Sequence, residues 1–236
     1  MPKSIDSRDR LIFALDVPTI EDARAWVDRL GDSVTYYKLG LEFCMGGRYF
    51  ELLEDLLAVG KKVFADIKFY DVPATVRGAV ANLARSGATC CTLHGVSSIY
   101  AGAVPVKGDM KLLAVTVLTS MDKDDIAELG WSGPVEELVS LRARKAIAAG
   151  IDGLICSGLE AKRLRSELGD APLIITPGIR GAGEKGGDDQ KRTMTHIEAF
   201  EAGADHIVVG RPIRNAPDPR KAAEAMQADI AAFFGK

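Results

Sequence analysis

The chain has 236 residues, of which 47% are hydrophobic and 27% are charged, and its formal net charge is −3. This composition is typical of a globular protein with one substantial core, and it excludes a disordered or fibrous chain. The slightly acidic balance provides no broad basic surface. Nucleic acid and acidic membranes are therefore not expected as partners, and any anion must be bound at a local site.

The N-terminal segment, residues 1–10, lacks the apolar stretch that a signal peptide contains. No later run approaches the roughly 20 apolar residues of a membrane-spanning helix. The cysteines are few, show no C-x-x-C spacing and are predicted to be reduced core thiols. They are Cys44, Cys90, Cys91 and Cys156. We therefore expect a cytoplasmic protein.

Short β-rich runs alternate with longer amphipathic segments along the chain, which is the pattern of repeated βα units and a parallel sheet. The helical period is clear at Ile20–Leu30 and Lys221–Phe234. Eight strands are predicted, at Leu11–Asp16, Val34–Lys38, Lys62–Asp66, Thr89–His94, Leu112–Thr116, Gly153–Cys156, Leu173–Thr176 and His206–Val209. Eight parallel strands in about 250 residues predict a closed (β/α)₈ or TIM barrel, here a single α/β domain over residues 1–236.

Charged residues stand at the carboxyl ends of the first three predicted strands. Asp16 ends the first strand, Lys38 ends the second, and Asp66 and Lys68 end the third. In a barrel these ends meet at one mouth, where the active sites of this fold lie. A local ion pair explains any one of these residues. Four alternating charges on adjacent strands favour a functional site over coincidence.

The third strand ends in the densest charge cluster, Asp66, Lys68 and Asp71. On an extended backbone Asp66 and Lys68 point the same way, while Ile67 points to the other layer and Asp71 lies just past the strand end. Neighbouring carboxylates favour the charged form of a lysine, so Lys68 suits charge stabilisation and proton donation better than Schiff-base chemistry. A solvated ion pair of small energetic consequence is the alternative interpretation.

The loops after the seventh and eighth predicted strands each combine glycine with arginine, as Gly178 with Arg180 and Gly210 with Arg211. Phosphate sites of barrel enzymes commonly lie in these two loops. Glycine lets main-chain N–H groups approach an anion, and arginine offers a fork of donors to its oxygens. We predict a phosphate site here. Turn glycines and surface arginines are the alternative.

Residues 177–194 are rich in Gly, Asp and Lys and show neither helical nor strand periodicity. This segment is long for a βα connection, and such loops are either surface segments or lids that close on a ligand. Its position beside the predicted phosphate site favours a lid. Simple solvation of the charge run remains the alternative.

Metal and nucleophile sites have little support in the sequence. His94, His196 and His206 do not show the i, i+4 spacing of a helical zinc pair, and His206 opens a strand at the end opposite the predicted site. Ser97 and Ser98 follow His94 without a G-x-S-x-G elbow, so a hydrolase triad is not indicated. We expect no metal ligands.

Taken together, these motifs resemble the orotidine 5′-phosphate decarboxylase family over nearly the whole barrel. The family's D-x-K-x-x-D signature appears as Asp66, Lys68 and Asp71, followed by a proline and Thr75. One departure is Ala74, which stands where the family usually has asparagine. The other matching positions are Asp16, Lys38, Leu118, Thr119, Ser120, Arg180, Gln190, Gly210 and Arg211.

The resemblance implies decarboxylation of orotidine 5′-monophosphate to UMP and CO₂ in pyrimidine biosynthesis, without a cofactor. It implies four catalytic residues, Lys38, Asp66, Lys68 and Asp71, with Lys68 stabilising and then protonating the C6 carbanion. It also implies a homodimer in which Asp71 and Thr75 reach into the neighbouring site. The substrate-binding residues it implies are Asp16, Lys38, Thr75, Thr119, Ser120, Arg180, Gln190, Gly210 and Arg211.

Two alternatives are consistent with the same motifs. One is a Mg²⁺-dependent phosphosugar decarboxylase or synthase that shares the barrel and the D-x-K-x-x-D signature. The other is a non-catalytic nucleotide-binding barrel that kept the phosphate site. The complete set Lys38, Asp66, Lys68 and Asp71 argues against the second, because a protein that only binds a nucleotide has no need of those charges.

Overall fold

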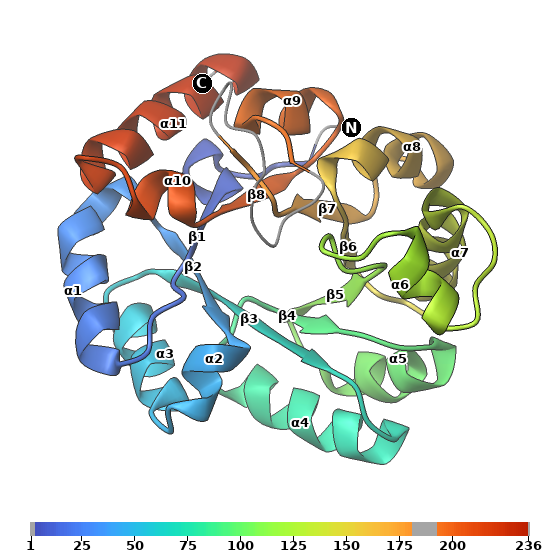
Figure 1. Ribbon diagram of the computed structural model, residues 1–236. Coiled ribbons are helices and arrows are strands. Elements are labelled where there is room, and N and C mark those ends of the chain that lie inside the picture. The colour runs from blue at the N-terminus through green and yellow to red at the C-terminus, as the bar shows by residue number, and fades with distance from the viewer. Residues whose placement is uncertain (1–2, 181–192, 236) are drawn as a thin grey trace.

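The computed structural model describes residues 3–180 and 193–235. Eight parallel strands pair in chain order, and the last pairs with the first, so the sheet closes into a barrel. The helices lie around the outside of the strands (Figure 1). The predicted (β/α)₈ architecture is confirmed.

The strands are β1 (Leu11–Ala14), β2 (Tyr36–Gly40), β3 (Lys62–Phe69), β4 (Cys90–Leu93), β5 (Lys111–Val115), β6 (Gly153–Ile155), β7 (Leu173–Thr176) and β8 (His206–Val209). The α-helices are α1 (Ile20–Leu30), α2 (Leu41–Met45), α3 (Tyr49–Ala58), α4 (Pro73–Arg85), α5 (Ser97–Ala103), α6 (Lys123–Glu128), α7 (Val135–Ala148), α8 (Gly158–Leu168), α9 (His196–Glu201), α10 (Arg211–Arg214) and α11 (Pro219–Phe234). Short 3₁₀ helices lie at Ser7–Arg10, Gly31–Ser33 and Val104–Val106.

Most predicted boundaries agree with the structure to within two residues, and β7, β8 and α1 have the predicted ends. The largest difference is in β3, which was expected to end at Asp66 and continues to Phe69. The register with β4 shifts between Ala65 and Phe69, so the extra residues are accommodated by an irregularity in the ladder. Residue-level patterns do not reveal such a shift, because it depends on the neighbouring strand.

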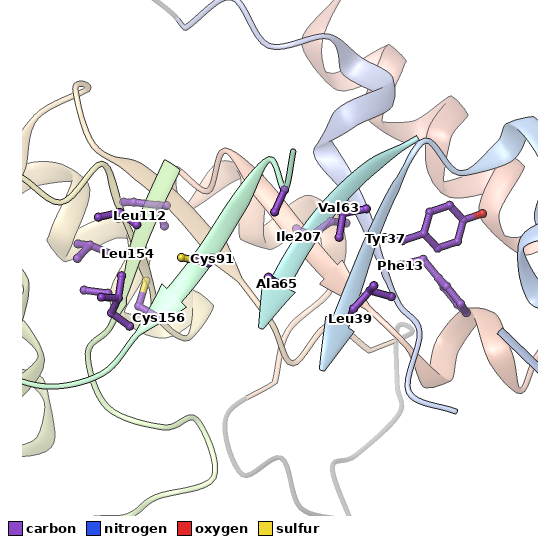
Figure 2. Packing of buried hydrophobic residues seen from close by; sticks show 14 of the residues in the cluster. Phe13, Tyr37, Leu39, Val63, Ala65, Cys91, Leu112, Leu154, Cys156 and Ile207 are labelled. Atoms are coloured by element: carbon purple, nitrogen blue, oxygen red, sulfur yellow. The ribbon is translucent and has the colours of Figure 1, made fainter. Parts of the chain in front are cut away.

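Side chains of each strand alternate between the barrel interior and the layer that contacts the helices. Tyr36 and Phe64 belong to the small interior cluster, whereas the next residues, Tyr37 and Ala65, belong to the larger cluster under the helices. Figure 2 shows part of this outer cluster, including Tyr37, Leu39 and Ala65. Both faces of every strand are therefore buried, which explains the continuous apolar runs in the sequence.

The amino ends of the strands carry ion pairs that hold the barrel together. Asp205 accepts bonds from Lys3 Nζ and Arg165 Nη2, both at 2.7 Å, and from the main-chain N–H of Ile174. Buried His206 makes a hydrogen bond through Nδ1 to the carbonyl of Asp9. These groups lie at the opposite end from the predicted site, as expected for His206. The charges of Asp205, Lys3 and Arg165 at this end are thus accounted for by contacts that stabilise the fold.

Among the helices of residues 3–180 and 193–235, none is both long and apolar enough to cross a membrane.

Candidate active site

A cavity of about 260 Å³ opens at the carboxyl ends of the strands. Its lining includes Asp16, Lys38, Asp66 and Lys68 from the ends of β1, β2 and β3, and Arg180 and Arg211 from the segments after β7 and β8. The remaining lining residues are Ala14, Phe64, Val115, Val117, Leu118, Thr119, Ser120, Ile155, Pro177, Gly178, Val208, Gly210 and Arg214. The structure thus brings the charged strand ends and the two Gly-Arg loops to one cavity.

Strand alternation places the acidic and basic side chains inside the barrel mouth. Lys38 is two residues after interior Tyr36, and Asp66 is two residues after interior Phe64. The β2–β3 register pairs Gly40 with Asp66. A Cβ atom on Gly40 would lie 3.3 Å from Lys38 Nζ and 3.4 Å from Asp16 Oδ1. Glycine at this position therefore leaves the space in which the Lys38 ammonium reaches its carboxylate partners.

The four charged groups form one continuous chain across β1, β2 and β3. Lys38 Nζ donates to Asp16 Oδ1 at 2.8 Å and lies 3.7 Å from Asp66 Oδ2. Lys68 Nζ donates to the other oxygen of Asp66, Oδ1, at 2.8 Å. The Lys38 and Asp66 side chains are 12% and 14% exposed, whereas Lys68 is 37% exposed. Of the two ammonium groups, that of Lys68 is therefore the more open to the cavity.

The surroundings keep the buried pair ionised. Burial raises the pKa of Asp66, but the charges of Lys38 and Lys68 outweigh it, so the pKa lies below the usual aspartate value. Burial lowers the pKa of Lys38, but the carboxylates of Asp66 and Asp16 outweigh it and raise the pKa above the usual lysine value. Opposite charges within about 4 Å have this effect when they exceed the desolvation penalty. The site holds fixed, preorganised charge near neutral pH.

Lys68 does not lie on an extended backbone, contrary to the expectation from strand alternation. Its φ is +56°, the only positive φ of a non-glycine residue among those described. Lys68 lies in the part of β3 where the register with β4 shifts, and its main-chain N–H donates to Thr92 Oγ1 on β4 at 2.9 Å. A left-handed conformation in a non-glycine residue costs about 1–3 kcal/mol, and such residues are enriched at active sites.

Thr92 supports both members of the pair. Its hydroxyl accepts from the Lys68 N–H and donates to Asp66 Oδ1 at 2.9 Å. Sequence reasoning missed this residue, although a buried threonine near the end of β4, next to the charged strand, was the available signal. The sequence analysis also missed Gly40, which leaves room for the Lys38 ammonium, and Arg214, which lines the cavity. Both observations depend on which segments lie close together in the folded chain.

Asp71 and Thr75 lie apart from the cavity in the single chain. Both are exposed, and neither lines the cavity. Asp71 Oδ1 accepts from the neighbouring Val72 N–H at 2.6 Å. Among the described residues of this chain, the ion pair of Lys68 is with Asp66.

The predicted phosphate loops, after β7 and β8, also line this cavity. Gly178 has φ of +80° after β7, and Gly210 precedes the single turn α10, which begins at Arg211. Arg180 is buried, and its main-chain N–H donates to the carbonyl of Met194 at 3.0 Å. Two glycines and two arginines of these loops therefore line the cavity.

The two ends of the predicted lid meet beside this site. Ile179 and Met194 form an isolated parallel bridge. Met194 packs on Gly158 so closely that a Cβ atom there would lie 1.9 Å from Met194 Sδ. These contacts hold Arg180 against the cavity. Gln190, and with it most of the lid at 177–194, lies outside the described residues.

Thr119 and Ser120, which the resemblance implies as substrate-binding residues, also line the cavity. Thr119 and Ser120 follow β5, and Thr119 is buried. Because Lys38 and Lys68 lie on one flank and the arginines on another, an elongated ligand with an anionic end fits this arrangement. Within the described ranges no cluster of three metal-binding side chains is found.

Comparison with known proteins identifies the family. The model of the "Orotidine 5'-phosphate decarboxylase / HUMPS family" matches residues 9–226. This chain belongs to that family. The orotidine 5′-phosphate decarboxylase of Methylococcus capsulatus is 50% identical over 232 residues, covering 98% of this chain and 96% of the relative. That of Xanthomonas campestris pv. campestris (strain 8004) is 51% identical over 233 residues, with the same coverage.

Solved structures of the family agree with the barrel. The orotidine 5′-phosphate decarboxylase of Lactobacillus acidophilus superposes with a TM-score of 0.83 at 35% identity, covering 97% of this chain and all of that one. The enzyme of Pyrococcus horikoshii gives a TM-score of 0.72 at 26% identity, covering 93% and 98%. The resemblance inferred from the motifs is confirmed.

Proposed function

We propose that this protein decarboxylates orotidine 5′-monophosphate to UMP and CO₂, a step of pyrimidine biosynthesis, with Lys68 as the proton donor. Family membership and half-identical relatives of that name support the reaction. The observation that carries the mechanism is the alternating chain Asp16, Lys38, Asp66 and Lys68, which faces one cavity together with Arg180 and Arg211.

The reaction needs positive charge at one carbon. The bond from C6 to the carboxylate breaks, CO₂ leaves, and the electron pair stays in an sp² orbital at C6 that the ring does not delocalise. A preorganised cation beside C6 stabilises this pair without reorganisation of solvent. The Lys68 ammonium then gives C6 a proton to complete UMP, and the neutral amine regains a proton from water. No cofactor has a part in this proposal.

Lys68 needs support to act in this way. Asp66 holds the ammonium at 2.8 Å, and the Lys38 ammonium in turn lies 3.7 Å from the other oxygen of Asp66. Asp66 also crowds the departing carboxylate, but we assign the larger part of the rate to electrostatic stabilisation. We propose that Lys38 and Asp16 also bind the ribose hydroxyls.

The other residues that line the cavity are proposed to bind the pyrimidine and the phosphate of the substrate. Thr119 and Ser120 would bind the pyrimidine, while Arg180, Gly210 and Arg211 would bind the phosphate, joined by Gln190 from the lid. Phosphate binding is far from C6, yet it contributes to the rate if its energy closes the lid and completes the site.

Arg211→Ala is expected to weaken the binding of phosphorylated ligands and to slow turnover. Loss of a charge-assisted contact to phosphate should raise the Kd of UMP roughly tenfold to a hundredfold. Titration of UMP and of uridine, together with steady-state kinetics, measures this. Arg163→Ala, which removes a surface ion pair with Glu167, is the matched control. It should leave the Kd of UMP and the turnover rate unchanged. An equal effect on uridine binding would contradict the phosphate role.

We further propose a homodimer in which Asp71 and Thr75 serve the neighbouring site. Both are exposed; Tyr70 and Val72 flank Asp71 in the chain, and Tyr70 packs against Gly95, the residue before Val96. Tyr70, Val72 and Val96 are each more than half exposed. An exposed group of large apolar residues is typical of an interaction surface. In a two-fold dimer the same surface is used by both copies, so each Asp71 has an equivalent position from which to reach its partner's Lys68.

Mixing two inactive variants tests this arrangement. If Asp71 acts across the interface, a dimer of one Lys68→Ala and one Asp71→Asn subunit contains one intact site. Statistical exchange of subunits should then restore about a quarter of the wild-type activity. Activity of the mixture after exchange is the measurement, and each variant alone is the control. A mixture as inactive as its components, once mass measurement shows that hybrids formed, would refute a shared site.

The direct test of the activity is formation of UMP from orotidine 5′-monophosphate with EDTA present. Turnover that EDTA does not affect supports the proposal. A requirement for Mg²⁺ and turnover of a phosphosugar instead would favour the phosphosugar decarboxylase or synthase. UMP binding without any turnover would favour a nucleotide-binding barrel. A cytoplasmic location remains a prediction.

A further inference from the structure

Arg214 is a cavity residue that neither the motif nor the proposed mechanism uses. It ends the single turn α10, three residues after Arg211, so the two arginines share one face of that turn. Both line the cavity. A Cβ atom on Gly210 would lie 3.4 Å from Arg214 Nη2, so the guanidinium covers this glycine at the predicted phosphate end.

The guanidinium is bound to Asp16 rather than to an element of its own loop. Nη1 donates to the main-chain carbonyl of Asp16 at 2.5 Å, and Nη2 lies 3.9 Å from Asp16 Oδ2. The other carboxylate oxygen of Asp16 accepts from Lys38 Nζ. Arg214 therefore fixes Asp16 both through the backbone that follows β1 and through its charge.

These contacts extend the charged chain by one cation. The sequence of partners becomes Arg214, Asp16, Lys38, Asp66 and Lys68, and the signs alternate throughout. Each carboxylate then has a cation on both sides. Asp16 is the less buried of the two carboxylates, with its side chain 38% exposed, so it has the greater freedom to move if a partner is removed.

We propose that Arg214 is a positioning residue that holds Asp16, and through it Lys38 and Asp66, in the geometry that Lys68 requires. It ties the loop after β8 to the carboxyl end of β1, two segments that are adjacent in the barrel but far apart in the chain. This inference rests on the proposed decarboxylation. Because Arg214 acts through Asp16, its loss should affect the chemical step more than ligand binding.

The test is a pair of variants assayed with orotidine 5′-monophosphate and with UMP. Arg214→Gln should lower kcat on the order of tenfold, because small displacements of reacting groups have effects of that size, while the Kd of UMP changes less than about threefold. Arg214→Lys, which keeps the cation, should recover most of kcat. Arg220→Gln on α11, which removes an exposed ion pair with Glu224, is the matched control and should resemble wild type.

A double-mutant cycle with Asp16→Ala separates positioning from other roles. If Arg214 acts through the Asp16 carboxylate, Arg214→Gln should have little further effect on kcat in the Asp16→Ala background. An equal fold-loss in both backgrounds would overturn the proposal, as would a loss of UMP affinity as large as the loss of kcat. Should Arg214→Gln fail to fold, Arg214→Met, which keeps the length of the side chain without its charge, completes the same cycle. A wild-type protein without decarboxylase activity would refute the proposed function, whereas an active wild type with a fully active Arg214→Gln would refute this role alone.

Discussion

Replacement of Lys68 by alanine is expected to abolish decarboxylation while UMP binding largely survives. The variant removes the cation that faces the cavity and the proposed proton donor together, so turnover should fall by at least about 10³-fold. UMP lacks the leaving carboxylate and develops no charge at C6, so its Kd should change only a few-fold. The fall in absorbance as orotidine monophosphate is consumed and titration of UMP give the two measurements.

Lys62→Ala is the matched control for this variant. Lys62 opens the same strand at the other end of the barrel, where it pairs with Asp9. Its removal should leave turnover unchanged. Near-normal turnover of Lys68→Ala would contradict the proposed mechanism. Equal losses in both variants would instead indicate damage to β3.

Asp66→Asn should reduce both turnover and stability, because Asp66 is the carboxylate between two ammonium groups. Removing one member of a buried charge pair typically costs about 3 kcal/mol. The same change leaves Lys68 without its anchor, and kcat should fall on the order of a hundredfold. Denaturant unfolding and steady-state kinetics measure the two effects.

The stability loss in Asp66→Asn should depend on pH. The folded pKa of Asp66 is below its ordinary value, so its contribution is present above about pH 4 and is lost as pH falls through the folded pKa. The folded pKa of Lys38 is raised, so its contribution is present below about pH 10 and is lost as pH rises through the folded pKa. The difference in unfolding free energy between wild type and Asp66→Asn should therefore be constant near neutral pH and become smaller in acid.

Asp55→Asn provides the comparison for this experiment. Asp55 pairs with Arg24 on the surface, with both side chains more than 40% exposed, so its loss should cost less than about 1 kcal/mol and leave kcat unchanged. If the loss of unfolding free energy in Asp66→Asn did not depend on pH, lost packing rather than lost charge would explain the destabilisation.

Periodicity in the chain predicted the barrel well because strands buried on both faces and amphipathic helices have distinct local patterns. The ends of β7, β8 and α1 agree with the prediction. The irregular end of β3 was missed because its cause is the register with β4 and the hydroxyl of Thr92, which stands 24 residues from Lys68. No local pattern encodes a contact at that separation.

By itself the sequence determined the eight-stranded barrel, the residues that stand at the strand ends, and the family signature through Asp66, Lys68 and Asp71. These depend on residue type and spacing, which are local properties. Only the tertiary structure decided the left-handed conformation of Lys68, the space left by Gly40 and the link from Arg214 to Asp16. Each depends on the distance between segments far apart in the chain, and that distance is fixed only when the barrel closes.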